Sequence, residues 1–179
     1  RNVVQGGSRA LDTPCFPTQF GCEATAAVRY DYNPARAQAL LAEAAYPDGF
    51  DTELVTYALP QWSAAIAGYL KAVGINARLT QLPVAAAVRL TLDGDSPISQ
   101  AAWGSYSIND VSAILPQFFT GGGNDYARNP DLAALVEQGG ASTNPNERRR
   151  HYSQAIRLIT EQAYMVPLNT YVTTYGITR

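Results

Sequence analysis

The sequence predicts an α/β domain, a single lobe in which helices flank a partly parallel, mixed β-sheet. Helical and extended patterns alternate between Asn33 and Leu82, where a strand, a helix and a second strand follow one another. Such a succession within one sheet implies a right-handed parallel crossover. Apolar residues make up 46% of the 179 residues and charged residues 16%, which suits a globular chain with a full core and argues against disorder.

The first half of the chain carries the clearest helix and strand signals. Asn33-Pro34 places a good N-cap before a proline at the first helical position, so a helix is expected to begin there. Residues 51–58 include Val, Thr and Tyr and predict a strand. A second helix is expected to open at Pro60 and to end at Gly74, where a left-handed C-cap would sit. Apolar and polar residues then alternate over 75–80, which predicts a second strand.

The second half repeats these signals. Asp110 is expected to cap a helix that Pro116 limits or kinks. The predicted elements are, in order, a helix from Pro83 to about residue 93, a strand over 98–103, a helix from Val111, helices that begin at Pro130 and Pro145, and a strand over 165–173.

Charge and composition exclude several functions. Thirteen basic and fifteen acidic residues give a formal net charge of −2, so nothing favours nucleic acid or an anionic membrane as a partner. The chain has one histidine, His151, and two cysteines without a CxxC spacing, so no metal site is predicted. Gly121–Gly123 lacks the ending of a phosphate-binding loop and is interpreted as a flexible turn, so no cofactor is expected. The run Arg148–Arg150 is interpreted as a solvated helical face.

The segment that follows the strand at 98–103 is the best candidate for ligand contact. In open α/β sheets, ligands bind beyond the carboxyl ends of the strands. This segment combines aromatic rings with hydroxyl, amide and carboxylate groups, the mixture that small polar ligands require. The alternative is that Trp103 fills the core and Asp110 only caps a helix. The candidate contacts are Trp103, Ser105, Tyr106, Ser107, Asn109 and Asp110, with Tyr126 as a further candidate.

Four longer stretches follow one another along the chain: NPARAQALLAEAAYPDGF, LDGDSPISQAAWGSYS, FFTGGGNDYARNPDLAALV and NPNERRRHYSQAIRLITEQAYMVPL. In this order, and with the strands and helix between them, they resemble the C-terminal lobe of the extracytoplasmic solute-binding proteins of family 5. This is the peptide, dipeptide and nickel class that serves ABC importers. The resemblance covers roughly residues 30 to 172.

The resemblance implies a fold of the periplasmic-binding-protein-like II kind and a substrate-binding component of an ABC importer rather than an enzyme. It also implies that the N-terminal lobe of the same protein is missing from this chain. The two lobes would close around a peptide or peptide-like solute in the bacterial periplasm and present it to a membrane permease. An opine, glutathione or a chelated metal is the alternative solute. In peptide-binding members, an aspartate shortly after the tryptophan pairs with the peptide's amino group. Here the acidic residue arrives only at Asp110, which disfavours a dipeptide held by its amino terminus.

Residues 1–32 are expected to form an irregular lead-in segment, and residues 33–179 the lobe itself. In an exported protein, Cys15 and Cys22, with six residues between them, most simply form a disulfide that closes a small loop. Such a bond contributes about 2 to 3 kcal/mol on the chain-entropy estimate. A pair of free buried thiols is the alternative.

Two other functions stay open from the sequence alone. A hydrolase with a serine or cysteine nucleophile would have to use His151, the only histidine. Its place after three arginines, at the start of an amphipathic helix, favours a solvated position instead. The other alternative is a free-standing interaction module that never had a second lobe.

Overall fold

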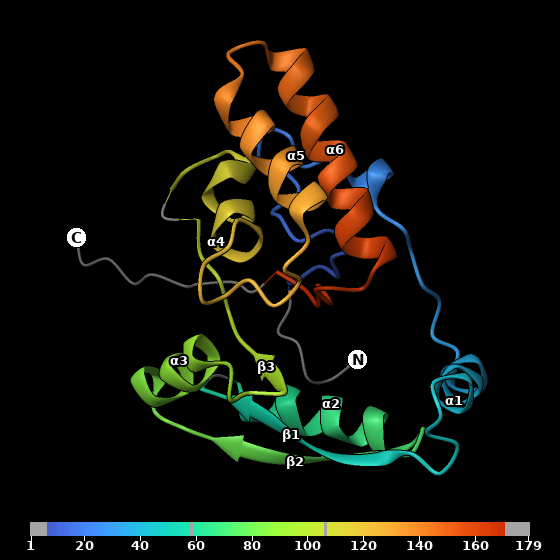
Figure 1. The fold of residues 1–179 in the computed structure, drawn as a ribbon. Coiled ribbons are helices and arrows are strands. Elements are labelled where there is room, and N and C mark those ends of the chain that lie inside the picture. The colour runs from blue at the N-terminus through green and yellow to red at the C-terminus, as the bar shows by residue number, and fades with distance from the viewer. Residues whose placement is uncertain (1–6, 58, 106, 171–179) are drawn as a thin grey trace. The chain divides into compact units, whose positions relative to one another are not determined.

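The computed structural model describes residues 7–57, 59–105 and 107–170. The chain divides into two compact units, whose elements are labelled in Figure 1. The sheet unit is the continuous stretch Tyr30–Trp103, and the helical unit combines the segment before it, through Arg29, with the segment after it, from Gly104. Three predicted features lie outside the described residues: Tyr106, the end of the first strand at residue 58, and residues 171–173 of the last predicted strand.

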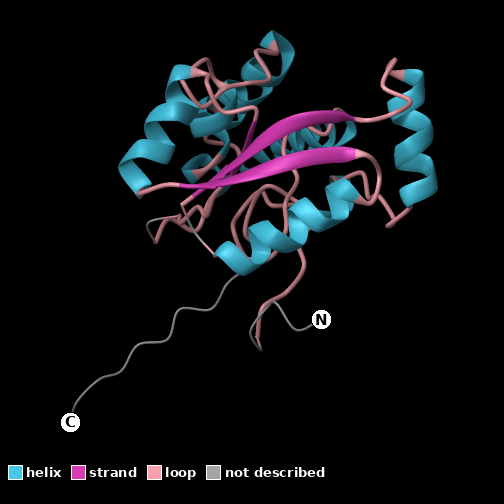
Figure 2. Cartoon of the chain, turned by 90° about the horizontal axis from the view of Figure 1, so that it is seen from below, coloured by secondary structure: helices cyan, strands magenta, loops and turns pink. Residues whose placement is uncertain are grey.

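The sheet unit confirms the predicted α/β class and its parallel crossover. Its three-stranded sheet has the order β2-β1-β3, with β1 parallel to both neighbours. Figure 2 shows the two long strands side by side. The elements are α1 (Pro34–Glu43), β1 (Phe50–Thr56), α2 (Pro60–Lys71), β2 (Ile75–Gln81), α3 (Val84–Asp93) and β3 (Ile98–Gln100).

Local chemistry explains where these elements begin and end. The side chain of Asn33 accepts a hydrogen bond from the backbone N–H of Arg36 at 2.9 Å, so the predicted N-cap is confirmed. The turn into β1 needs a glycine at position 49. Gly49 has φ 79°, and a Cβ there would lie 1.9 Å from the carbonyl oxygen of Gly74, at the turn into β2. The two parallel strands can start side by side because the residues that meet there, Gly49 and Gly74, have no side chains.

The strand predicted over 98–103 is shorter than expected, because β3 ends at Gln100. Its partner β1 ends at Thr56, which pairs with Gln100 in the register, so the later residues have no strand to bond to. Side-chain hydrogen bonds also hold Gln100 at the end of β3. The hydroxyls of Thr56 and Ser63 donate to the Gln100 amide oxygen at 2.7 and 2.6 Å, and all three residues are buried.

The helical unit is built around two long helices that lie side by side, α5 (Pro130–Ala141) and α6 (Pro145–Glu161) (Figure 1). Both begin after a capping asparagine, as predicted: Asn129 accepts from two backbone N–H groups, and so does Asn144. The shorter elements are the 3-10 helices η1 (Ala24–Ala26) and η2 (Val111–Ala113) and the helix α4 (Leu115–Phe119). The helix predicted from Val111 is thus split, with Pro116 in the first turn of α4.

One apolar cluster fills the helical unit, with members from the lead-in, η2, α4, α5 and α6. Its buried residues are Cys15, Cys22, Val111, Leu115, Phe119, Leu132, Val136, Tyr152, Ala155, Ile156 and Ile159. The lead-in therefore packs with the C-terminal part of the chain. Beyond Met165, up to residue 170, the only β pairing is an isolated antiparallel bridge between Ala10 and Asn169. Among the described residues, no helix is long and apolar enough to cross a membrane.

Candidate functional site

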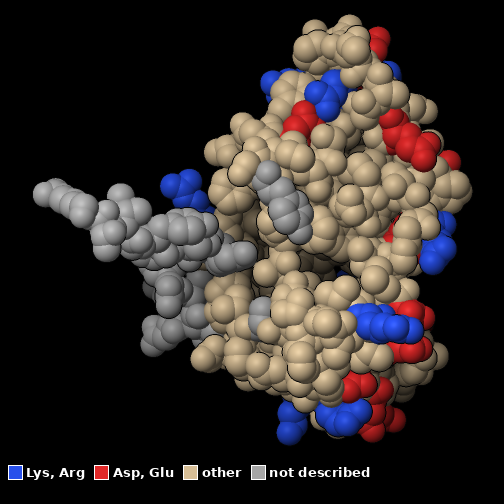
Figure 3. Space-filling model, turned by 90° about the vertical axis from the view of Figure 1, so that its left-hand side faces the viewer, with Lys and Arg blue, Asp and Glu red and all other residues tan. Residues whose placement is uncertain are grey.

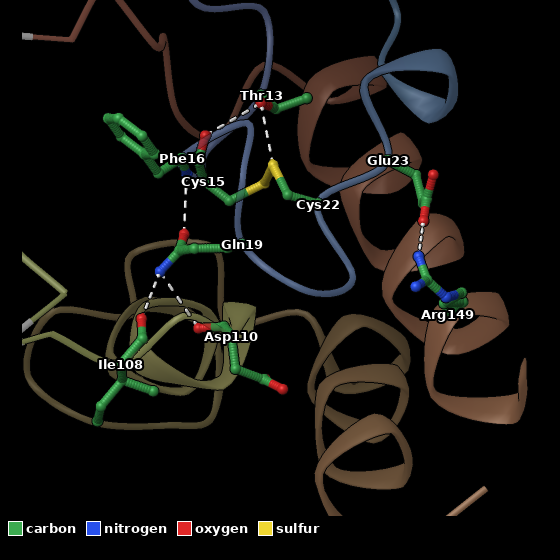
Figure 4. The surroundings of a disulfide bond; sticks show 9 residues. All are labelled: Thr13, Cys15, Phe16, Gln19, Cys22, Glu23, Ile108, Asp110 and Arg149. Atoms are coloured by element: carbon green, nitrogen blue, oxygen red, sulfur yellow. Dashed lines mark hydrogen bonds and ion pairs between the residues drawn. A yellow bond between two sulfur atoms is a disulfide. The ribbon is translucent and has the colours of Figure 1, made fainter. Parts of the chain in front are cut away.

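A disulfide between Cys15 and Cys22 closes the loop that builds one side of the candidate site. Their Cα atoms are 5.9 Å apart, and both residues are buried. The hydroxyl of Thr13 donates to the carbonyl of Cys15 at 3.2 Å. The predicted disulfide is confirmed, and the alternative of two free thiols is wrong. Figure 4 shows this loop with its surroundings.

Gln19 fastens the loop to the segment that follows residue 104. Its amide oxygen accepts from the backbone N–H of Phe16 at 2.8 Å. Its amide nitrogen donates to the backbone carbonyls of Ile108 and Asp110 at 3.1 and 3.3 Å. In Figure 4 the Gln19 side chain lies between these groups. Because Gln19 is buried, one side chain holds both segments in register with little competition from water.

Backbone hydrogen bonds continue this junction. The N–H of Phe20 donates to the carbonyl of Asn109 at 3.0 Å, and the N–H of Val111 donates to the carbonyl of Phe20 at 3.0 Å. These bonds form a short parallel bridge between Phe20 and Asp110. The loop and the predicted ligand segment are therefore neighbours although about ninety residues separate them in sequence.

An open hollow of about 290 Å³ lies between the two segments. One wall comes from the disulfide-closed loop, and the other from the predicted ligand segment. Over the part of the chain that the structure describes, no charged side chain lines it. The lining residues are Phe16, Thr18, Gln19, Ser105, Ser107, Ile108 and Asn109.

The hollow brings together three of the predicted contacts, Ser105, Ser107 and Asn109. Trp103 belongs to the sheet unit, is 37% exposed, and does not line the hollow. Tyr126 follows the turn after α4 and does not line it either. Sequence reasoning missed Phe16, Thr18 and Gln19. The available signal was the pair of cysteines, since a predicted disulfide marks the loop between them as a fixed surface.

Asp110 has a structural role next to the hollow. Its carboxylate accepts from the backbone N–H of Ser112 at 2.9 Å, which confirms the predicted cap, and pairs with Arg148 at 2.9 Å. Both side chains are about one-fifth exposed. The hydrogen bond that Arg148 donates to the hydroxyl of Tyr152 raises the pKa of Arg148. Desolvation lowers this pKa, and the hydrogen bond to Asp110 and the charge of its carboxylate raise it further. The carboxylate is thus already neutralised by a permanent cation.

The start of α6 is not uniformly solvated, contrary to the interpretation of Arg148–Arg150. Arg148 also donates to the carbonyl of Gly139 at 3.0 Å. The guanidinium carbons of Arg148 and Arg149 lie 4.9 and 4.5 Å from the ring centroid of Phe20, and Arg149 pairs with Glu23 at 2.7 Å. These cation–π contacts and ion pairs attach the lead-in to α6. Elsewhere, charges of both signs lie close together on the face in Figure 3, most of which is uncharged.

The comparison that decides the family is a match to the model of the bacterial extracellular solute-binding proteins, family 5 (middle), over residues 1–126. The chain belongs to this family. A probable di/tripeptide-binding protein 5 of Pseudomonas aeruginosa is 26% identical over 192 residues, which cover 99% of this chain and 35% of the relative. The chain thus spans about a third of the length of the curated relatives that it matches.

Solved structures of family 5 proteins share the fold. HbpA2 from Haemophilus parasuis matches with a TM-score of 0.83 and 26% identity, over 92% of this chain and 35% of that one. The periplasmic binding protein DppA from Helicobacter pylori, in complex with the peptide STSA, matches with a TM-score of 0.81 and 24% identity, over 92% of this chain and 34% of that one. The periplasmic-binding-protein-like II fold implied by the sequence is thereby confirmed.

The surroundings of His151 differ from those of a catalytic histidine. Its Nδ1 is buried without a hydrogen-bond partner among the described residues, and its Nε2 lies 3.2 Å from the guanidinium of Arg150. A triad requires a serine or cysteine on one ring nitrogen and an orienting group on the other. The named relatives within family 5 are substrate-binding proteins. The described residues contain no group of three or more His, Cys, Asp or Glu side chains that could hold a metal ion.

Proposed function

We propose that this chain is one lobe of the substrate-binding component of an ABC importer, and that it contributes half of a cleft for a peptide or peptide-like solute. The observation that carries the proposal is membership of family 5 together with a fixed, uncharged hollow beside the predicted ligand segment. In this proposal residues 33–179 are the lobe, residues 1–32 lead into it, and an N-terminal lobe supplies the opposing contacts.

The solute class is supported by what the relatives are. The Pseudomonas aeruginosa relative is a probable di/tripeptide-binding protein, and the Helicobacter pylori structure contains a peptide. A peptide offers backbone acceptors and donors that hydroxyl and amide side chains can satisfy, which suits Ser105, Ser107 and Asn109.

The proposed mechanism involves no covalent step, so we propose a binding protein and not an enzyme. A solute would be held by burial in the cleft and by hydrogen bonds, and the closed state would be stabilised by contacts that exist only when both lobes engage it. The closed form would then be presented to a permease at the membrane, from the periplasm. The candidate contacts in this chain are Ser105, Ser107 and Asn109, with Trp103, Tyr106, Asp110 and Tyr126 as the further candidates that the sequence predicts.

Isothermal titration calorimetry tests this proposal. The protein at its full encoded length and the 179-residue chain would each be titrated with di- and tripeptides. We expect the longer protein to bind with micromolar or tighter affinity. The 179-residue chain should bind at least a hundred-fold more weakly, because the contacts from the N-terminal lobe are absent. His151→Ala should leave both affinities unchanged and no peptide should be cleaved.

Two results would contradict the proposal. Equal affinity of the two proteins would mean that this chain holds the whole site, which favours the free-standing module. Peptide cleavage that is abolished by His151→Ala would instead establish a hydrolase.

A further inference from the structure

The wall formed by the disulfide-closed loop combines buried and exposed residues. Cys15 and Gln19 are buried, yet the ring of Phe16 between them is 49% exposed and Thr18 is exposed as well. On the facing wall, Ile108 is 50% exposed. Two large apolar side chains are thus left open to solvent at opposite sides of one small hollow, alongside hydroxyl groups. Such a surface can bury the apolar part of a ligand and bond its polar part.

The facing wall is held in a conformation that side chains rarely adopt. Ser107 has φ 67°, and the turn around it is closed by a hydrogen bond of 2.9 Å from the N–H of Ile108 to the carbonyl of Ser105. A non-glycine residue in the left-handed region costs about 1–2 kcal/mol and persists only where the surroundings enforce it. Gln19 holds the next residue of this turn, because its amide nitrogen donates to the Ile108 carbonyl at 3.1 Å.

Both walls are therefore fixed before any ligand arrives. The disulfide closes one, Gln19 joins it to the other, and the backbone bonds of Phe20 extend the junction. A site that is ordered in advance loses little conformational entropy on binding, so its contacts contribute more fully to affinity.

The hollow offers no counter-ion to a charged ligand group. None of the described side chains that line it is ionisable. The carboxylate nearest in sequence, that of Asp110, forms an ion pair with Arg148 and accepts a hydrogen bond from the backbone N–H of Ser112. The carboxylate of Glu23 forms an ion pair with Arg149. A carboxylate or ammonium group placed between these walls would lose water without gaining a counter-ion, which is unfavourable. Apolar groups incur no such penalty, and uncharged polar groups can hydrogen-bond to the hydroxyl and amide side chains of the walls.

The volume limits how much of a solute can enter. About 290 Å³ is at the lower end of the roughly 300–1,000 Å³ of ligand pockets, so the hollow suits part of a solute and not the whole. We propose that it is a subsite for one uncharged residue of a peptide-like solute, with the disulfide-closed loop as its second wall and Thr18 as a residue that sets its selectivity. The inference rests on the proposed function and adds to it the class of group that binds here.

The test adds a charge to one wall of the hollow and measures how the protein's affinity for charged and uncharged peptides changes. The probes are Ala-Ala-Ala and its variants in which each position in turn is replaced by Ser, Asp or Lys, titrated against the protein at its full encoded length. In the wild type, one peptide position should accept Ser but lose roughly ten-fold in affinity with Asp or Lys, since an unpaired charge is worth about that much near a surface.

Thr18→Asp should reverse part of this preference. At that same position, the Lys peptide should gain roughly ten-fold relative to the wild type and the Asp peptide should weaken further. Thr18 is exposed in a turn, where aspartate is well tolerated, so the variant should fold. Thr143→Asp is the matched control, because it adds the same charge at an exposed position of the same unit that does not line the hollow. Its binding profile should equal that of the wild type.

The outcomes separate this inference from the proposal on which it rests. If the wild type binds none of the tripeptides, the proposed peptide function fails and the subsite fails with it. If it binds them but Thr18→Asp and Thr143→Asp give the same profile, only the subsite is overturned. Tolerance of Asp and Lys at every peptide position of the wild type would also overturn it.

Discussion

At the scale of single residues, the backbone conformation of Ser107 leads to a prediction about the free energy of unfolding. Its φ of 67° lies in the left-handed region, which glycine adopts without steric strain. We expect Ser107→Gly to stabilise the folded protein by about 0.5–1 kcal/mol, because relief of strain exceeds the added entropy of the unfolded chain. The measurement is the urea midpoint of unfolding.

Ser153→Gly is the control for this substitution. Ser153 lies inside α6, where glycine is unfavourable, so that variant should lose about 0.5 kcal/mol. The same Ser107→Gly protein also lacks a hydroxyl that lines the hollow, so its affinity for peptides should fall while its stability rises. A loss of stability in Ser107→Gly would mean that the serine side chain, not the backbone strain, dominates at this position.

Residues whose role is local were the ones the sequence could predict. Asn33, Asn129 and Asn144 each cap a helix as expected, because a cap depends only on the next few residues. Gln19 and Phe16 were not predicted as part of a site. Gln19 bonds to carbonyls about ninety residues away, and the residues that line the hollow opposite Phe16 are as distant. The local sequence does not indicate such distant pairings.

At the scale of elements, the packing of α5 against α6 depends on a glycine. A Cβ at Gly139 would lie 2.5 Å from the ring of Tyr152, which is fully buried and bonded to Arg148. Gly139→Ala should therefore destabilise the protein by about 1–3 kcal/mol through overpacking, although alanine favours helices. The adjacent Gly140 has open space around it and is exposed, so Gly140→Ala should stabilise by up to about 1 kcal/mol.

Chemical denaturation of the two single variants measures this difference directly. The pair is well matched, since both changes add one methyl group to the same helix at consecutive positions. Equal effects in the two variants would contradict the close approach of α5 and α6 at Gly139.

Element type was easier to predict than element length. The strand–helix–strand of the sheet unit follows from periodicity and from stop signals at glycine and proline. The end of β3 at Gln100 does not, because it is set by where β1 ends and by buried side chains that converge on Gln100. Sequence patterns carry little information on where one strand stops pairing with its neighbour, because that point depends on both strands.

At the scale of the whole molecule, the two compact units have separate cores. The apolar cluster of the helical unit includes both cysteines and no residue of the sheet unit, whose buried apolar residues are Leu54, Val55 and Ala87. Sequence reasoning predicted one lobe after a lead-in and did not foresee that the lead-in packs with the C-terminal helices. The reason is that the contacts of Cys15 and Cys22 in this core are almost all distant in sequence.

Because the cores are separate, removal of the disulfide should destabilise the helical unit and leave the sheet unit unaffected. Replacing both Cys15 and Cys22 with alanine removes the disulfide, whose contribution to the free energy of unfolding is about 2.5 kcal/mol on the chain-entropy estimate. Amides of α5 and α6 that exchange through opening of the helical unit should then exchange ten- to a hundred-fold faster. Amides of β1 and β2 should keep their protection, because their hydrogen bonds and buried residues belong to the sheet unit.

Native-state hydrogen exchange followed by mass spectrometry distinguishes the two units, and the wild type with and without dithiothreitol is the control for the substitutions themselves. Reduction should reproduce the pattern of the double variant. Equal acceleration in β1 and in α6 would show that the chain opens as one cooperative body. In that case the division into two units would describe packing but not stability.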